Sequence, residues 1–501
     1  MRLILSTEAK PVGFYATLSH CWEGLKPLQL TNDSLKQHLE GIALVDMPWT
    51  FRDAVLVTRK LRVRYLWIDS LCILQGDRAD WQIEASLMHA VCSNSYCSFS
   101  ATWAKNGTQG LFRQLKTTAL SLEPISVSWA APTSIKEVKH VRQCIAFELE
   151  SQRWQDNVTL SPVNRRAWVL QERLLSPRVL HFCQGQIFWE CRSQSASEEF
   201  PKSPIHTYMD GGSKFKDNAE YFEYVEKARS RALESWEKEA AFEAWQNIVV
   251  VYSKTSLTVA TDKLIALSGI ATSMLVLLGT HVAGLWRESL ERQLSWAAIT
   301  ETDSSPCSSI PSDYCAPTWS WASIQGPIQF VACSDLIEYQ VVDVELQFTT
   351  DDTTGQVLSG YLDLCGLLRS LVFTVISDTS TVYTLDVIKG PMQGNAMACF
   401  DESPINLALI IDDCAQARLY SMNIGSEKSD RSALMLRVVD VHKGIFERIG
   451  LMNWTITEGD WNGGEPALNH DIGGDQEVES AQLQALPYLR YENGQHTIRV
   501  I

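Results

Sequence analysis

The segment Tyr65-Leu-Trp-Ile-Asp-Ser-Leu-Cys-Ile-Leu-Gln75 decides the fold of the first part of this 501-residue chain. It opens with a short aromatic and aliphatic run, typical of a buried strand, that stops abruptly at Asp69. Residues 51–61 have the pattern of a helix, and residues 14–18 form another strand-like run. Strand, helix and strand in this order predict an α/β domain, in which a mostly parallel sheet carries helices on both faces.

A second helix is predicted directly after this segment. Asp80 is expected to cap its free amides, and Ile83, Leu87 and Val91, which recur every four residues, are expected to form its buried stripe. Glu84 lies one position round from Ile83, at the margin between core and solvent. A carboxylate there is either a surface charge or a site residue.

The pattern of apolar and polar residues changes twice along the chain, which predicts three regions. They are an α/β domain over residues 1–200, a helical segment over 201–300 and a β-rich C-terminal region over 301–501. Residues 264–286 carry no Asp, Glu, Lys or Arg, and their polar residues favour a buried helix over a membrane span. Trp319 and Trp321 are expected on a strand, facing the same side. Residues 455–479 are acidic and Gly-rich, which predicts a loop.

Charge and cysteine content restrict the class of protein. The formal net charge of −16 repels phosphate backbones and anionic lipid on average, so nucleic acid is not an expected partner, although a local basic patch remains compatible with it. Thirteen cysteines without a CxxC pair predict reduced thiols in a cytosolic or nuclear setting, and the cytoplasm is the expected location. The N-terminus has too few apolar residues before Glu8 for a signal peptide.

Four blocks in order resemble the fungal heterokaryon incompatibility (HET) family over residues 15–172. The blocks are Tyr15-Ala-Thr-Leu-Ser-His-Cys-Trp22, Met47-Pro-Trp-Thr-Phe-Arg-Asp-Ala54, Tyr65 to Gln75 as quoted above, and Arg166-Ala-Trp-Val-Leu-Gln-Glu172. The resemblance implies a Toll/interleukin-receptor-like (flavodoxin-like) sheet and a role in self/non-self recognition and programmed cell death in a filamentous fungus. It also implies a protein partner or self-association.

The chain departs from the family pattern at two places. Glu23 stands where the family usually has Gly, and Gln75-Gly-Asp77 stands where an acidic residue commonly follows the Gln. Related proteins usually carry a longer segment ahead of the first block, so the chain is expected to be either truncated or a compact member.

Polar residues cluster where the two predicted strands end, which is where ligands bind in open α/β sheets. The candidate ligand-binding residues follow the two strands or lie in the last block: Ser19, His20, Trp22, Ser70, Cys72, Gln75, Trp168 and Gln171. The alternative is that the tryptophans belong to the core and that Ser19 and Asp69 satisfy turn amides.

The resemblance to Toll/interleukin-receptor domains implies a candidate reaction, the cleavage of NAD. Such chemistry needs a carboxylate near the ribose and an aromatic wall, with NAD as substrate and no metal or cofactor. Glu84, Glu172 and Asp69 are the candidate catalytic carboxylates, with Trp22 or Trp168 as the wall. In the alternative, Glu84 is a solvated helix residue and Glu172 pairs with Arg166 or Arg173, so whether the chain is an enzyme stays open.

Other site chemistries have weaker support. Ser19, His20 and Cys21 are adjacent, but neighbours on a strand point to opposite faces, which disfavours a nucleophile dyad. His181, Cys183 and Cys191 have no standard zinc spacing. Two further functions remain as alternatives: an enzyme recruited to small-molecule metabolism, and a catalytically silent interaction module.

Overall fold

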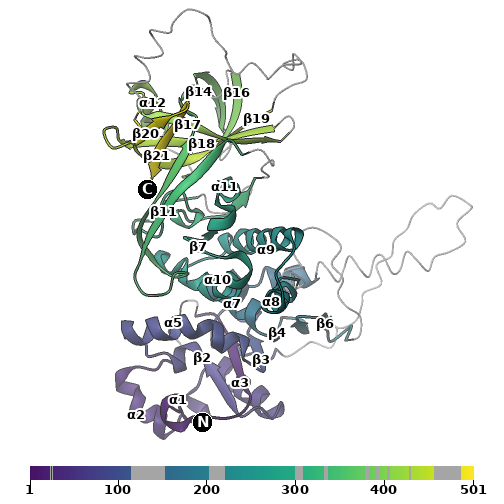
Figure 1. The fold of residues 1–501 in the computed structure, drawn as a ribbon. Helices are drawn as coiled ribbons and strands as arrows, with labels where there is room; N and C mark the ends of the chain where they lie inside the picture. Colours follow the sequence, from purple (N-terminus) through teal and green to yellow (C-terminus); the bar gives the residue numbers. More distant parts are fainter. Residues whose placement is uncertain are drawn as a thin grey trace, which may run out of the picture. The chain divides into compact units, whose positions relative to one another are not determined.

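A computed structural model describes residues 1–22, 24, 26, 28–113, 153–201, 220–299, 308–331, 337–378, 383–389, 394–402, 407–427, 430–455 and 487–501. The chain divides into two compact units (Figure 1). The first comprises Met1–Ala240, Thr255–Leu257 and Ile265–Ser273, and the second Ala241–Lys254, Thr258–Leu264 and Met274–Ile501. Glu23 and the predicted loop from residue 456 onward lie outside the described residues.

The first unit is built on a six-stranded sheet with the order β2-β1-β3-β4-β5-β6. The strands that pair in parallel are β1 (Tyr15–Ser19), β2 (Tyr65–Ile68), β3 (Cys97–Ser100) and β4 (Arg178–Phe182). The antiparallel ones are β5 (Ile187–Cys191) and β6 (Ser195–Ser197). The predicted mostly parallel α/β sheet is confirmed. The strand order reverses between β1 and β3, and the carboxyl ends of strands at such a reversal are where α/β proteins bind ligands.

Helices precede, connect and follow these strands. They are α1 (Ser6–Ala9), α2 (Asn32–Glu40), η1 (Leu44–Asp46), α3 (Trp49–Lys60), α4 (Asp69–Cys72), α5 (Arg78–Ser93), η3 (Gln155–Thr159), η4 (Val163–Arg165), α7 (Ala167–Leu175) and α8 (Glu220–Ser230). The predicted helix at residues 51–61 corresponds to α3.

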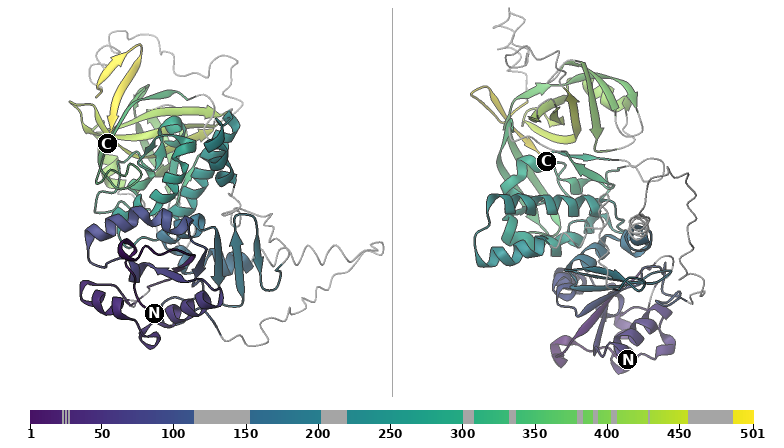
Figure 2. Two further views of the ribbon diagram at one scale, coloured as in Figure 1. Left: turned by 60° about the horizontal axis from the view of Figure 1, so that its bottom comes forward. Right: turned by 90° about the vertical axis from the view of Figure 1, so that its right-hand side faces the viewer.

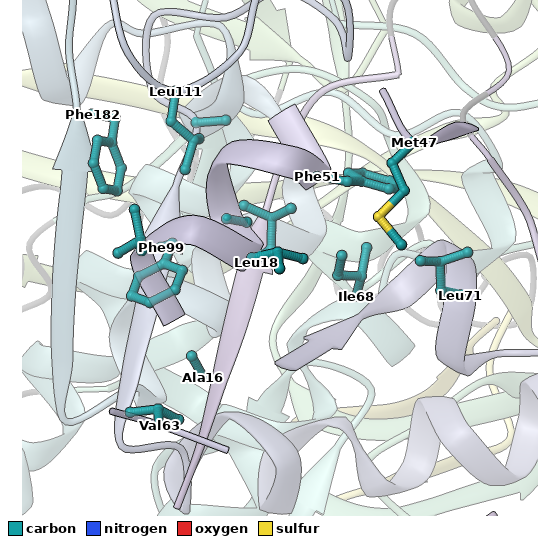
Figure 3. Packing of buried hydrophobic residues seen from close by; sticks show 14 of the residues in the cluster. Ala16, Leu18, Met47, Phe51, Val63, Ile68, Leu71, Phe99, Leu111 and Phe182 are labelled. Atoms are coloured by element: carbon teal, nitrogen blue, oxygen red, sulfur yellow. The ribbon is translucent and has the colours of Figure 1, made fainter. Parts of the chain in front are cut away.

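Strand β1 separates an apolar layer from a polar one. Ala16 and Leu18 face α3 and share a buried cluster with its Phe51 (Figure 3). On the opposite face, the hydroxyl of Tyr15 donates to the carbonyl of Val91 in α5 at 2.8 Å, and Ser19 reaches α7. Helices therefore cover both faces of the sheet, as predicted, and the purple helices on its two sides are visible in Figure 2.

Helix α5 differs from its prediction in two respects. Its cap is Asp77, whose carboxylate accepts from the amides of Ala79 and Asp80, whereas Asp80 itself accepts from the amide of Leu74. The predicted buried stripe is wrong, because Ile83 and Leu87 are 59% and 45% exposed. The residues buried instead are Ala85, Met88 and Cys92. This face packs against α7, so the helix buries two small side chains and one methionine and leaves the larger branched ones exposed.

Gly76 accounts for one departure from the family pattern. Its φ of +88° is a left-handed conformation that side chains disfavour, and no other atom lies near its missing Cβ. The turn between α4 and α5 therefore uses glycine for its backbone conformation.

The second unit consists of helices and a β-rich region. Its helices are α9 (Ser235–Ser253), which starts in the first unit, η6 (Ala260–Asp262), the C-terminal part of α10 (Ile265–Leu278), η7 (Arg287–Ser289), α11 (Leu290–Gln293), η8 (Trp321–Ser323) and α12 (Leu407–Ala415). Two small sheets pair β7 (His281–Val282) with β8 (Leu285–Trp286) and β9 (Trp296–Ala298) with β10 (Ile328–Phe330).

An eleven-stranded sheet forms the rest of this unit, which confirms the predicted β-rich C-terminal region. Its strands are β11 (Tyr339–Phe348), β12 (Val357–Gly366), β13 (Leu368–Ser370), β14 (Val372–Asp378), β15 (Tyr383–Lys389), β16 (Gly394–Phe400), β17 (Leu419–Glu427), β18 (Asp430–Asp440), β19 (Ile445–Thr455), β20 (Arg490–Glu492) and β21 (Gln495–Val500). Fourteen buried residues, among them Leu385, Met435 and Trp454, pack into one apolar cluster on this sheet.

Two apolar segments in the second half of the chain are buried to a large extent: the helical stretch Ala260–Leu278 and the region around Trp319 and Trp321. By length and composition alone, the helical stretch Ala260–Leu278 is apolar enough to cross a membrane, and 61% of its most apolar window is buried inside the structure. Such burial is typical of a core helix. The predicted strand around Trp319 and Trp321 is wrong: both side chains are buried in a turn that leads into η8, where the Trp321 indole N–H donates to the Gly284 carbonyl.

Candidate functional site

The hydroxyl of Ser19 and the carboxyl of Glu172 meet at the carboxyl end of β1. Ser19 is the last residue of β1, and Glu172 lies in the middle of α7. The Ser19 hydroxyl donates a hydrogen bond to Glu172 Oε2, and both side chains are buried. Two residues that are 153 positions apart in the chain thus join at the strand end predicted to hold the site.

The pKa of Glu172 is raised to about 7. Burial is the main cause, because removal from water disfavours the charged carboxylate, and the negative charge of Asp69 adds to the effect. The positive charge of Arg166 and the Ser19 hydrogen bond oppose it. A carboxyl that changes protonation near neutral pH can act as a general acid or base.

His20 and Asp69 form the second part of the site. His20 follows β1 and is 1% exposed, with its Nδ1 3.8 Å from Asp69 Oδ1. Its ring stands edge-on to Phe51 of α3, on the face opposite Ser19, and burial lowers its pKa. Asp69 begins α4 and accepts from the amide of Ser70 at 2.7 Å. With 21% of its side chain exposed, Asp69 is more accessible than Glu172.

Arg166 connects the two segments that carry these residues. Its guanidinium donates to the carbonyl of His20 and lies over the ring of Trp22 at 5.9 Å. The indole N–H of Trp22 and both ring nitrogens of His20 have no hydrogen-bond partner among the described residues. Buried polar groups are normally paired, so these atoms are exceptions that lie within the site. Sequence reasoning treated Arg166 only as a partner of Glu172 and missed this contact.

A neighbouring group contains Cys72 and Glu84. Burial and the charges of Asp69 and Glu84 raise the pKa of the Cys72 thiol to about 12. Burial and Asp80 also raise the pKa of Glu84. The charges that act on the Cys72 thiol are those of Asp69 and Glu84, so these three side chains lie near one another. The charges that act on Glu172 are those of Arg166 and Asp69. Asp69 is thus the residue that the two groups share.

The remaining predicted residues serve other contacts. Ser70 donates to the carbonyl of Leu28, and the Gln75 side chain to the carbonyl of Ile73. Trp168 stands edge-on to Trp81 of α5. Gln171 is fully buried beside α10, and its side-chain amide has no hydrogen-bond partner among the described residues.

Gly269 of α10 allows the close approach to Gln171. A Cβ atom at position 269 would lie 2.6 Å from Gln171 Oε1 and 2.7 Å from His89 Cβ. We expect Gly269→Ala to lower the free energy of unfolding by about 1–3 kcal/mol through overpacking, despite the better helix propensity of alanine. The melting temperature of the full chain, followed by thermal unfolding, measures this loss of stability. Gly185→Ala, where no atom lies within 4 Å, is the control; an equal melting temperature for both variants would contradict the close packing.

Nucleophile and metal chemistry receive no support from these contacts. The Ser19 hydroxyl is hydrogen-bonded to Glu172 and not to His20, whose ring lies on the other face of β1. Within the part of the chain that the structure describes, no three His, Cys, Asp or Glu side chains gather as metal ligands would.

A buried ionic network lies beside the site and was missed by the sequence reasoning. Arg173 of α7 forms two hydrogen bonds of 2.8 and 2.9 Å with Glu190 of β5. His181 Nε2 lies 3.0 Å from Glu190 Oε2, and the Thr102 hydroxyl 3.5 Å from His181 Nδ1. Arg173 therefore pairs with Glu190 and is not the partner of Glu172. The available signal was Glu190 at an inward position of an alternating strand, next to buried Phe188.

Comparison with known proteins agrees with the four sequence blocks. Residues 15–172 match the family model described as "Heterokaryon incompatibility protein (HET)". No curated protein and no solved structure matches the chain. The matched residues include β1 through α7, with both Ser19 and Glu172. Residues 15–172 of this chain are therefore a domain of the heterokaryon incompatibility family.

Proposed function

We propose that this protein is a cytoplasmic self/non-self recognition protein that triggers programmed cell death, and that its HET domain acts by hydrolysing a nicotinamide dinucleotide. The observation that carries the catalytic part is the buried Glu172 carboxyl, with a pKa near 7, at the carboxyl end of β1. The cell-death role comes from the family alone, and a protein partner or self-association would supply the trigger.

The strand order supports a Toll/interleukin-receptor-like arrangement. The order β2-β1-β3-β4 with parallel pairing is the order of flavodoxin-like sheets, in which the ligand lies where β1 and β3 diverge. Ser19 ends β1 and pairs with Ser100, which ends β3. This position supports the proposal, because flavodoxin-like sheets bind nucleotides at the corresponding strand ends.

The residues of the site fit the proposed reaction. When the N-glycosidic bond breaks, the nicotinamide nitrogen keeps the electron pair, and positive charge develops at the anomeric carbon of the ribose. A carboxylate near that carbon stabilises the charge, and water adds to the carbon while its proton passes to a carboxylate. Asp69, the more exposed carboxylate, would face the ribose, and Glu172 would accept the proton.

Expression in a fungal host tests the proposal. We expect the full chain to kill the host while cellular NAD falls, and we expect Glu172→Gln and Asp69→Asn to abolish both effects. The side-chain carbonyl of a glutamine in place of Glu172 can still accept from Ser19, so the variant keeps the packing. Glu40→Gln, at an exposed position of α2, is the control and should kill like the wild type. Death with unchanged NAD would refute the hydrolase and leave the effector role; survival of all strains would refute both.

A further inference from the structure

The edge of the first sheet where the parallel strands begin carries exposed cations. Arg62 and Arg64 precede β2, and Arg178 begins β4; all three are exposed. Lys60 ends α3 at the same edge, because α3 runs back from the carboxyl ends of the strands to the start of β2. None of these four residues forms an ion pair with another residue that the structure describes.

Exposed apolar side chains lie among these cations. Val12 and Phe14, just before β1, are 87% and 69% exposed, and Leu61 is 42% exposed. The ring of Phe14 lies 5.2 Å from that of Tyr96, which precedes β3, and the guanidinium of Arg178 lies over Tyr96 at 5.2 Å. Contacts thus connect the starts of three neighbouring strands. We call Val12, Phe14, Arg62, Arg64, Tyr96 and Arg178 the strand-start surface.

Arg62 is held in an unfavourable backbone conformation. Its φ of +58° is left-handed, which costs a residue with a side chain about 1–2 kcal/mol relative to glycine. Two hydrogen bonds close this turn, from the amide of Arg62 to the carbonyl of Arg59 and from Val63 to Thr58. Stability alone would favour a glycine at this position. The presence of an arginine there therefore indicates a role for its side chain other than stabilising the fold.

We infer that the strand-start surface docks the protein on an anionic membrane surface. Clustered Lys and Arg side chains attract acidic lipid head groups, and protruding Val12 and Phe14 can enter the boundary between head groups and acyl chains. The overall charge of −16 repels acidic lipid on average, but physiological salt weakens interactions beyond about 8 Å, so the charges next to the surface have the larger effect. Glu8 is the acidic residue nearest in sequence to Val12 and Phe14, and Lys10 lies between Glu8 and these two residues.

A protein partner fits these side chains less well. Protein interfaces place their central aromatic residues in well-packed pockets. Val12 and Phe14 are instead among the most exposed apolar residues of the first unit, on a segment that begins after Lys10. The site at Ser19 and Glu172 lies at the opposite ends of the strands, so docking through this surface leaves that site free of the bilayer.

Vesicle sedimentation with the full chain tests the inference. We expect binding to phosphatidylcholine vesicles that contain about one third phosphatidylserine, no binding to phosphatidylcholine alone, and loss of binding in high salt. Each cation near an acidic surface contributes about fivefold, so Arg62→Gly with Arg64→Gln should weaken binding about 30-fold. Arg62→Gly also relieves the left-handed residue, so this variant should not melt at a lower temperature.

Matched variants separate specific docking from general charge. Lys443→Gln with Arg490→Gln removes two exposed cations from the second unit and should leave binding unchanged. Phe14→Ser with Val12→Ser should weaken binding at least about fivefold while the cations remain. The inference is overturned if the wild type does not bind acidic vesicles, which is the result expected if the surface binds an acidic protein instead. It is also overturned if the Arg62→Gly with Arg64→Gln variant binds as well as the Lys443→Gln with Arg490→Gln variant.

Discussion

Replacing Arg173 with methionine is expected to lower the free energy of unfolding of the first unit by about 3–5 kcal/mol. Arg173 is 7% exposed and is the cationic partner of Glu190, which is 1% exposed. Without the guanidinium, the Glu190 carboxylate stays buried beside His181 and loses the permanent positive charge that balances it. Pulse proteolysis of the full chain in urea, with peptides from residues 153–201 followed, measures the loss.

The double variant Arg173→Met with Glu190→Gln is the control for this effect. It removes both charges, so it should recover a large part of the lost stability, because the cost arises from an unpaired buried charge and not from the loss of an attraction. If the double variant were as unstable as the two single losses added together, the network would contribute through packing alone.

Glu172→Gln is expected to remove a pH dependence of stability. The carboxyl titrates near pH 7 in the folded chain and near 4.5 when unfolded, so the protonated form stabilises the fold. This contribution is fully present below about pH 4.5 and is lost as the pH rises through 7, a loss of about 3 kcal/mol at 1.36 kcal/mol for each unit of pKa. Urea unfolding between about pH 5 and pH 9 measures it.

Ser19→Ala sharpens this test. The Ser19 hydrogen bond favours the charged carboxylate, so its removal should raise the pKa of Glu172 further, extend the fall of stability to higher pH and make the total loss larger. The glutamine variant should be more stable than the wild type at high pH. Equal pH profiles for wild type and Glu172→Gln would show that Glu172 ionises normally.

Local patterns predicted the elements of the first unit well. The runs at residues 14–18 and Tyr65 to Ile68 became β1 and β2, and residues 51–61 became α3, because each has a strong periodic or β-branched signal. The predicted stripe of α5 is wrong because the buried residues are Ala85, Met88 and Cys92, whereas Ile83 and Leu87 are exposed. Periodicity counts hydrophobic residues and does not detect where small ones allow close packing.

The sequence could predict which residues follow the strands at the candidate site, but not which side chains contact one another there. The stops of β1 and β2 indicated Ser19, His20 and Asp69, and the family block indicated Glu172. That Ser19 binds Glu172, and that Arg173 pairs with Glu190, depends on how α7 lies across the sheet. Such pairings join residues that are far apart in the chain, and no local pattern encodes them.

Release of nicotinamide by the purified full chain tests the central claim most directly. Incubated with NAD and followed by chromatography, the wild type should release nicotinamide at a rate that rises as the pH passes through about 7, where Glu172 becomes a carboxylate able to accept a proton. Glu172→Gln should be slower by about 100-fold or more, as for the loss of a general base. No release by the wild type, or equal release by both proteins, would contradict the account.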